Sequence, residues 1–348
     1  MRIIGGGRRF GLHAAAALVL LFATIGIVGT AKVARAASVP TYSHSYYITQ
    51  PNTTAIQSLA SSAATWSNQH CPTNGTWELL ILDFGQITVY NNNYATFDRG
   101  GNFDSFSTVK SLALTFANTW FNDTTNCPRL YFGIGVNNYH ECPGGSSNCS
   151  VYTAAEDWAA IVTDVLVTLQ GQNESWQIQP WGADDMEAGW DTYTCANSPG
   201  CIYGDSWQQT QFFVNGYNYY DSQSGTHTDL ADYGDAAYGS IDLQGNSWTA
   251  SNVYTAAWGA VYDVPVPEIY YSGDAQDWVT VIKSGSPGLT FEGPMTECTG
   301  GDPLPTGQCW VAGPNGTGDY EESPTRAWND LYNDTGQQAP YTTNIQSQ

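Results

Sequence analysis

Residues 181–190 read WGADDMEAGW and place three carboxylates within four positions. The acids are Asp184, Asp185 and Glu187, and a tryptophan stands at each end of the run, at Trp181 and Trp190. Carboxylates repel one another and lose solvation on burial, so a packed core gains no stability from such a cluster. The run is therefore interpreted as a solvated turn, a calcium site or half of an active site.

Paired carboxyl groups are the groups that glycoside hydrolysis requires. One acid with a raised pKa protonates the leaving oxygen, and the other acts as nucleophile or activates water. We assign the acid/base role to Glu187 and the nucleophile role to Glu292. The residues expected to hold or stack on the sugar, or to tune the catalytic pair, are Asp83, Asp184, Asp185, Asp232, Asn137, Tyr270, Trp181 and Trp190.

Several of these residues also have a structural interpretation. Asp83 could cap the loop that begins at Gly85, and Asp232 could form a turn. Tyr270 could be a packing residue. A calcium site at 184–187 would satisfy several carboxylates, although no Asp-x-Asp-x-Asp-Gly loop is present.

The elements that must position these residues alternate between extended apolar runs and amphipathic helices. The clearest helix spans 153–171, where Thr153-x-x-Glu156 matches a capping box and apolar residues follow the 3.6 period. The predicted strands lie at 45–49, 78–84, 130–136, 176–181, 229–233, 267–271 and 289–292, and the other predicted helices at 54–68, 107–121, 207–217, 250–260, 275–283 and from 323 onward.

Seven or eight strand–helix units predict a single-domain (β/α)8 barrel of the TIM type over residues 37–348. Such a barrel carries its site at the carboxyl ends of its strands, where these acids fall. The alternative is a doubly wound sheet, which usually carries a glycine-rich phosphate turn that is absent here. The residues from about 335 onward are expected to form a loose tail.

The first 36 residues are typical of a secretory signal peptide. A positive run, MRIIGGGRRF, precedes an apolar stretch at 14–28, and A-R-A at 34–36 is a cleavage signal. The mature chain is therefore expected to begin at Ala37 and to be secreted. Arg8 and Arg9 leave twin-arginine export open, and a membrane anchor is the alternative to cleavage. No later stretch is apolar enough to span a bilayer.

Charge limits the class of partner. The first 36 residues hold five of the ten Lys and Arg residues and none of the 32 Asp and Glu residues, which leaves the mature chain a formal net charge of −27. Five cations cannot form a phosphate-binding surface, so nucleic acid is a poor partner. Many Tyr, Trp, Asn, Gly and Thr residues favour a neutral, polar ligand such as a glycan. We expect a monomer.

All eight cysteines lie in the mature part, and export permits disulfides. Three pairs are close in sequence, and the remaining two cysteines pair by elimination. The expected disulfides are Cys142–Cys149, Cys195–Cys201, Cys298–Cys309 and Cys71–Cys127. A metal site is the alternative, but no C-x-x-C spacing occurs.

Other hydrolytic chemistries lack their motifs. The chain has no Gly-x-Ser-x-Gly elbow and no His-Glu-x-x-His sequence. Cysteine catalysis requires a free thiol, which eight paired cysteines do not leave. We expect no metal and no cofactor.

The runs WELLILDFGQ, LYFGIGVNN, WGADDMEAGW, PEIYYSG and LTFEGP together resemble a group of secreted bacterial proteins of unknown function, described as glycoside-hydrolase-like (β/α) barrels. The resemblance covers residues 42–332. The order of Glu187 and Glu292 is also similar to that of barrel glycosidases with catalytic glutamates after strands four and seven. That clan usually has asparagine before the first glutamate, where Met186 stands here.

Two hypotheses follow. The first is an exported glycoside hydrolase acting on a neutral polysaccharide or cell-wall glycan by a two-carboxylate mechanism. The second is a catalytically inactive barrel that binds glycan or serves as a cell-surface module. Met186 and the crowding of Asp184 and Asp185 favour the second hypothesis.

Overall fold

The computed structural model describes residues 39–71, 77–138, 149–188, 207–236, 248–259, 263–285, 290–298, 308–311 and 319–348. These residues belong to one compact unit, Val39–Gln348. The predicted signal peptide, Trp190, Cys142 and the Cys195–Cys201 pair lie outside the described residues. Among the helices that are described, none is both long enough and apolar enough to cross a membrane.

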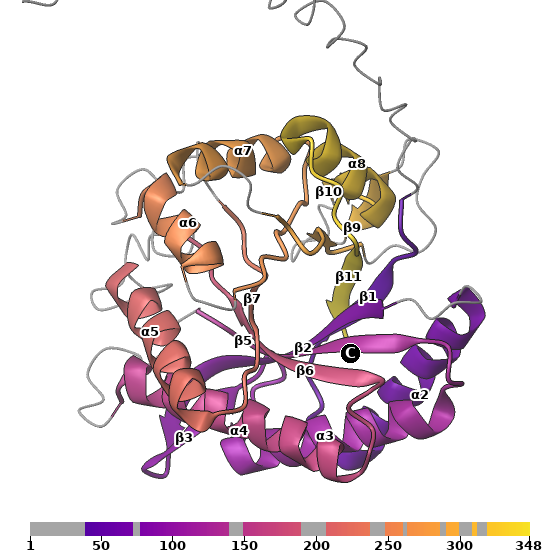
Figure 1. Cartoon of the computed structure of the whole chain (residues 1–348), viewed down its shortest axis with the longest axis vertical. Coiled ribbons are helices and arrows are strands. Elements are labelled where there is room, and N and C mark those ends of the chain that lie inside the picture. Colours follow the sequence, from indigo (N-terminus) through magenta and orange to yellow (C-terminus); the bar gives the residue numbers. More distant parts are fainter. Residues whose placement is uncertain are drawn as a thin grey trace, which may run out of the picture. The chain divides into compact units, whose positions relative to one another are not determined.

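A parallel sheet of seven strands forms the centre of this unit (Figure 1). Strands and helices alternate along the chain, which confirms the predicted α/β class. The order across the sheet is β7-β6-β5-β2-β1-β11-β8. The strands are β1 Ser43–Tyr47, β2 Trp77–Tyr90, β5 Arg129–Asn137, β6 Ile178–Asp185, β7 Leu230–Asp232, β8 Met295–Thr296 and β11 Thr343–Ser347.

Helices cover the outer face of the curled sheet (Figure 1). Each of α2, α3, α4, α6 and α8 begins at a Ser, Thr or Asn whose side chain accepts a backbone N–H of the first turn, as N-caps do. The cap of α4 is Ser150, three residues before the predicted Thr153. The helices are α2 Thr53–His70, α3 Phe106–Asp123, α4 Val151–Gly171, α5 Trp207–Ser224, α6 Ala250–Trp258, α7 Asp274–Ser284 and α8 Pro324–Thr335.

The predicted closed barrel of eight strands is wrong. The regular sheet is open and curls through 227°. The predicted strand at 267–271 is replaced by an irregular segment that contains Pro265 and Pro267 and forms only isolated bridges. Proline has no N–H to donate, so this segment cannot complete a regular ladder.

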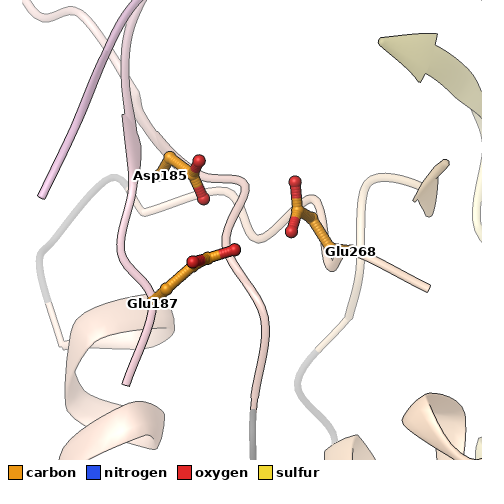
Figure 2. Close-up of side chains that lie close together, drawn as sticks. All are labelled: Asp185, Glu187 and Glu268. Atoms are coloured by element: carbon orange, nitrogen blue, oxygen red, sulfur yellow. The ribbon is translucent and has the colours of Figure 1, made fainter. Parts of the chain in front are cut away.

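The irregular segment still connects the two edges of the sheet. The N–H groups of Val264 and Val266 donate to carbonyls of β7 at 2.9 and 2.7 Å. On the opposite side, the carbonyls of Pro265 and Pro267 accept N–H groups from β8 and the residues before it, both at 2.9 Å. At both proline positions the neighbouring chain needs only a carbonyl acceptor, so the missing proline N–H costs no hydrogen bond. The segment also carries Glu268, whose side chain faces Asp185 at the end of β6 and Glu187 just after it (Figure 2).

The end of the chain forms a strand rather than the expected loose tail. β11 runs parallel to β1, with register pairs from Ser43↔Thr343 to Tyr47↔Ser347. Ile345 is fully buried, and the hydroxyls of Ser45 and Thr343 are 2.8 Å apart. The strand was not predicted because its sequence, TNIQS, is polar and contributes only one large apolar side chain to the core.

Two antiparallel additions were also not predicted. β2 continues past residue 84 to Tyr90 and pairs with β3 (Asn93–Phe97), which in turn pairs with β4 (Phe103–Ser105). β9 (Gln308–Val311) and β10 (Asp319–Glu322) form a separate two-stranded ribbon.

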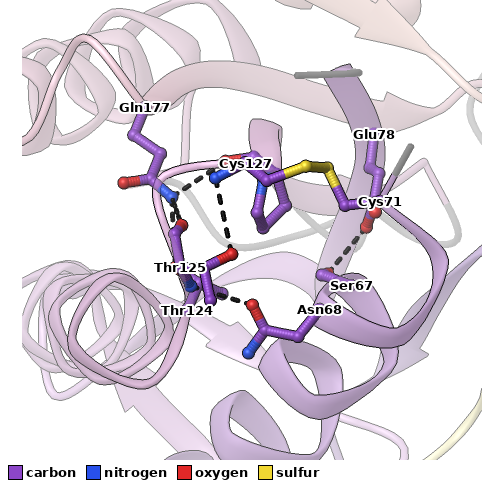
Figure 3. Close-up of a disulfide and its surroundings, with 9 residues drawn as sticks. Ser67, Asn68, Cys71, Glu78, Thr124, Thr125, Cys127 and Gln177 are labelled. Atoms are coloured by element: carbon purple, nitrogen blue, oxygen red, sulfur yellow. Dashed lines mark hydrogen bonds between the residues drawn. A yellow bond between two sulfur atoms is a disulfide. The ribbon is translucent and has the colours of Figure 1, made fainter. Parts of the chain in front are cut away.

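Two of the predicted disulfides are confirmed. Cys71, at the end of α2, is bonded to Cys127, just before β5 (Figure 3). Next to this bond the Thr125 N–H donates to the Asn68 side-chain oxygen at 2.8 Å. Cys298 is bonded to Cys309. The Cys142–Cys149 pair cannot be compared because Cys142 lies outside the described residues, although Cys149 is itself disulfide-bonded.

Removal of the Cys71–Cys127 bond should destabilise the fold more than removal of Cys298–Cys309. The first closes 56 residues and the second 11. Loop-closure entropy of the unfolded chain gives a loss of about 4 kcal/mol for the first double Cys→Ser variant and about 3 kcal/mol for the second. Denaturant titration of both variants measures the difference. A smaller loss for the 56-residue loop would contradict the expectation.

Candidate active site

The end of β6 carries the acids of the WGADDMEAGW run. The strand continues through Asp185 instead of ending at 181. Asp184 and Asp185 are register partners of Val136 and Asn137 on β5. The exposed fractions of Asp184, Asp185 and Glu187 are 0%, 1% and 8%. The interpretation of this run as a solvated turn is therefore wrong.

Strand alternation decides which acids face the inside of the curled sheet. Ala183 and Ala231 belong to the core cluster enclosed by the sheet. Successive side chains point to opposite faces, so Asp185 shares the inner face with Ala183. Asp184 and Asp232 lie on the other face, between sheet and helices. These two residues were predicted to hold sugar hydroxyls, and their placement gives them no access to the inner face.

The inner positions at the carboxyl ends of neighbouring strands carry polar groups. Tyr47 of β1 is the register partner of Asp83 on β2, and Asn137 of β5 is that of Asp185 on β6. The Asp83 carboxylate accepts the Gly85 N–H at 2.5 Å and the Asn137 amide at 3.3 Å. The predicted site residues Asp83, Asn137 and Asp185 therefore lie together in one layer.

Three carboxyl groups meet at the centre of this layer (Figure 2). Asp185, Glu187 and Glu268 are buried, and each offers an oxygen within 4.8 Å of the others. Glu187 is the neighbouring carboxylate that raises the pKa of Glu268 most, so protonation of one of the two relieves their repulsion. The same three oxygens could alternatively surround a cation.

Burial is the main cause of the raised pKa values in this cluster. It raises the pKa of Asp185, Glu187 and Glu268 well above the usual range, because a buried carboxylate loses its hydration. Repulsion between neighbouring carboxylates raises each pKa further. Such a perturbed group of acids is typical of functional sites.

Two neighbours orient the Glu187–Glu268 pair. The Tyr270 hydroxyl donates a hydrogen bond to Glu268 Oε1. The Asn138 side chain accepts the Glu187 N–H at 3.1 Å and donates to the Glu187 carbonyl at 3.2 Å. Tyr270 was predicted as a site residue, whereas Asn138 acts on the backbone of Glu187 and not on a ligand.

One cation stands among these acids. The Arg99 guanidinium lies 3.4 Å from the centre of the Tyr47 ring, and its Nη1 is 3.7 Å from Glu297 Oε1. Burial raises the pKa of Asp83, Asp185 and Glu187, and the Arg99 charge opposes that rise. Arg99 thus partly compensates the negative charge of the layer.

Arg99→Met should raise the pH at which the carboxyls of the layer ionise. Without the guanidinium charge, the pKa values of these carboxyls rise, because nothing else described in the layer is positive. Lys110→Met is the matched control, since Lys110 pairs with Asp164 on the helical surface at 3.0 Å. NMR titration of the carboxyl groups in both variants and the wild type gives the result. An Arg99→Met titration that overlays the wild type would contradict this role.

Glu292 does not join the carboxyl cluster. Its neighbours Asp229 and Tyr131 belong to the amino-terminal ends of their strands. Burial raises the pKa of Glu292, and Asp229 adds to the rise. The strand near 292 begins only at Met295, so Glu292 precedes that strand instead of following it. Glu292 therefore takes no part in the mechanism proposed below.

Trp181 is a core residue. It is 2% exposed, belongs to the enclosed cluster and stacks on Tyr131 with ring centres 4.3 Å apart. This burial removes it from the sugar-stacking role that the sequence suggested.

A pocket of about 380 Å³ opens beside the carboxyl layer. It shares Arg99 and Asn137 with that layer. The other residues that line it are Gly85, Gln86, Phe97, Asp98 and Gly101. Asp185, Glu187 and Glu268 are not among its lining residues.

No protein-family model and no curated protein matches the chain. Among solved structures, a conserved exported protein from Bacteroides fragilis is 12% identical, with a TM-score of 0.45 over 89% of this chain and 70% of that one. The Bacillus cereus spore cortex-lytic enzyme SleL is 9% identical, with a TM-score of 0.38 over 88% and 71%. Likeness at these values does not indicate what this chain does.

Proposed function

We propose that the chain is an exported glycoside hydrolase that acts on a neutral polysaccharide or a cell-wall glycan. The observation that supports this most directly is the buried group of Asp185, Glu187 and Glu268, which bring one carboxyl oxygen each within 4.8 Å of the others. An acid that keeps its proton near neutral pH beside an ionised carboxylate is the combination that glycosidic bond cleavage uses.

In this proposal Glu187 is the proton donor and Glu268 is the nucleophile. The Tyr270 hydroxyl donates to Glu268, which favours the ionised form of Glu268, and the proposal therefore places the proton on Glu187. A bound glycosidic oxygen accepts a hydrogen bond from the protonated Glu187. The oxygen takes that proton as its bond to the anomeric carbon breaks, while the Glu268 carboxylate forms a bond to that carbon.

The second half of the reaction restores both groups. Glu187, now ionised, takes a proton from water, and the resulting hydroxide displaces Glu268 from the anomeric carbon. Oxygens within 4.8 Å of one another are nearer to the spacing of about 5–5.5 Å in retaining enzymes than to the spacing of about 6.5–9.5 Å in inverting enzymes. The proposal therefore specifies retention of the anomeric configuration.

Export is part of the proposal. The two described disulfides fit an oxidising compartment, and the A-R-A signal at 34–36 supports cleavage and release. A strongly acidic, secreted chain without a basic surface suits a neutral glycan.

A panel of neutral polysaccharides and cell-wall glycans tests the function, with the anomeric form of the first product followed by NMR. Turnover with retention is expected, and EDTA should not change its rate. Loss of turnover in EDTA would assign Asp185, Glu187 and Glu268 to a cation instead. Binding without turnover would support the alternative, an inactive glycan-binding barrel.

A further inference from the structure

We propose that the hairpin of β2, β3 and β4 carries a second glycan-binding surface, an aromatic track made of Tyr90, Phe103 and Phe97. This track would guide a polymeric neutral glycan into the pocket beside Arg99. The class of ligand rests on the proposed function, whereas the location of the surface rests on the hairpin itself.

The three rings form a continuous row. The Tyr90 and Phe103 rings are stacked, with centres 4.5 Å apart and planes inclined by 9°. The Phe103 and Phe97 ring centres are 4.7 Å apart. Tyr90 and Phe103 are 48% and 45% exposed, among the largest exposures of apolar side chains in the described chain. Large rings held open to water in a row have a binding role more often than single exposed residues do.

The strand register places all three rings on one face of the hairpin. Phe97 is directly opposite Phe103 in the β3–β4 pairing and opposite Gln86 in the β2–β3 pairing. Tyr90 lies four residues beyond Gln86 on β2 and therefore on the same face. The track is thus a property of the hairpin backbone and does not depend on a chance side-chain orientation.

Gly85 fixes where the hairpin bends from the sheet. Its φ is +86°, and a Cβ there would lie 2.2 Å from the Phe97 carbonyl oxygen. Only glycine accepts both this conformation and this approach. The β2 register shifts between Asp83 and Gln86 at the same point. The bend therefore lies between Asp83, which belongs to the carboxyl layer, and the part of β2 that pairs with β3.

The track meets the proposed site at one end and a second hollow at the other. Phe97 lines the pocket of about 380 Å³ that also contains Arg99 and Asn137. Tyr90 borders a depression of about 580 Å³ lined in part by Asn91 and Asn93. Aromatic rings bordered by amides match a chain of sugar rings, which present apolar C–H faces and many hydroxyls. We therefore infer a substrate that extends over several sugar units.

Depletion isotherms on insoluble cellulose, chitin, xylan and β-1,3-glucan test the track, with every protein carrying Glu187→Gln so that binding is measured without turnover. We expect at least one polysaccharide to bind. Tyr90→Ala and Phe103→Ala should each weaken that binding about tenfold. Phe103→Leu keeps an apolar side chain in the strand but removes the ring, and should weaken binding similarly.

Tyr219→Ala is the matched control. Tyr219 is 53% exposed on α5, which is not part of the hairpin, and its loss should leave binding unchanged. Melting temperatures show that the variants are folded. Equal binding by folded track variants and wild type, or no binding to any of the four polysaccharides, would overturn the track. Track-dependent binding, together with no turnover of the same polysaccharides by protein that retains Glu187, would reject the hydrolase but keep this surface.

Discussion

Glu187→Gln should lower kcat for glycan hydrolysis about a thousandfold, because general acid catalysis contributes roughly 10²–10⁴-fold. Glutamine has the shape of the acid but cannot transfer a proton at neutral pH. It can still bond to Glu268, so the cluster should stay folded. Glu268→Gln should cause a comparable loss, since the nucleophile would be absent. Initial rates at saturating substrate measure both effects.

Glu292→Gln is the matched control for these variants. Glu292 is a half-buried carboxyl near the amino ends of the strands, beside Asp229 and away from the site. The same chemical change there should alter kcat less than about twofold, because the side chain contacts no reacting group. If Glu292→Gln were as inactive as Glu187→Gln, the pairing suggested by sequence order would be correct and the Glu187–Glu268 mechanism would be rejected.

The fold should be most stable in acid and lose stability as pH rises through neutrality. Burial raises the pKa of Asp232 from 3.8 to about 7 and the pKa of Glu78 from 4.5 to about 7. Between the unfolded and folded pKa values the folded chain binds more protons, so the free energy of unfolding falls with rising pH. Below about pH 4 these carboxyls are protonated in both the folded and the unfolded chain, and the folded chain has its full stability.

The size of this effect can be bounded. Ionisation of Asp232 alone lowers the free energy of unfolding by at most on the order of 4 kcal/mol. Ionisation of the site carboxyls lowers it further. We expect the melting temperature to fall by about 5–10 °C between pH 4.5 and pH 8. Calorimetry at several pH values measures it. Asp232→Asn should flatten the dependence, and a melting temperature that rises over this interval would show that these carboxyls ionise without penalty.

The central strands of the sheet are the part of the fold that the sequence predicts well. LLILDF and LYFGIGV are apolar because both faces of a central parallel strand are buried. The apolar pattern alone therefore makes Asp83 and Asn137 candidate site residues, since they stand at the carboxyl ends of these strands. Glu187 follows from the same reasoning, because it comes just after the strand that ends in Asp185.

Glu268 and Arg99 could not be found in this way. Glu268 is the second residue of the strand predicted at 267–271, so it was placed near the start of that strand, away from the expected site, and the structure has an irregular segment there. Arg99 lies between β3 and β4, two strands that were not predicted from the sequence. Glu292 was chosen because it comes at the seventh predicted strand. Counting strands does not show where a strand begins, and Glu292 lies before Met295, the first residue of β8.

The pairing of β1 with β11 has a consequence for how the molecule assembles. Ser43 and Thr343 are register partners across 300 positions of sequence, and β1 separates β11 from β2. Non-local strand pairing of this kind delays folding, because the loop entropy is lost before the contacts form. Folding of the sheet therefore stays incomplete until residues 343–347 are available to pair with β1.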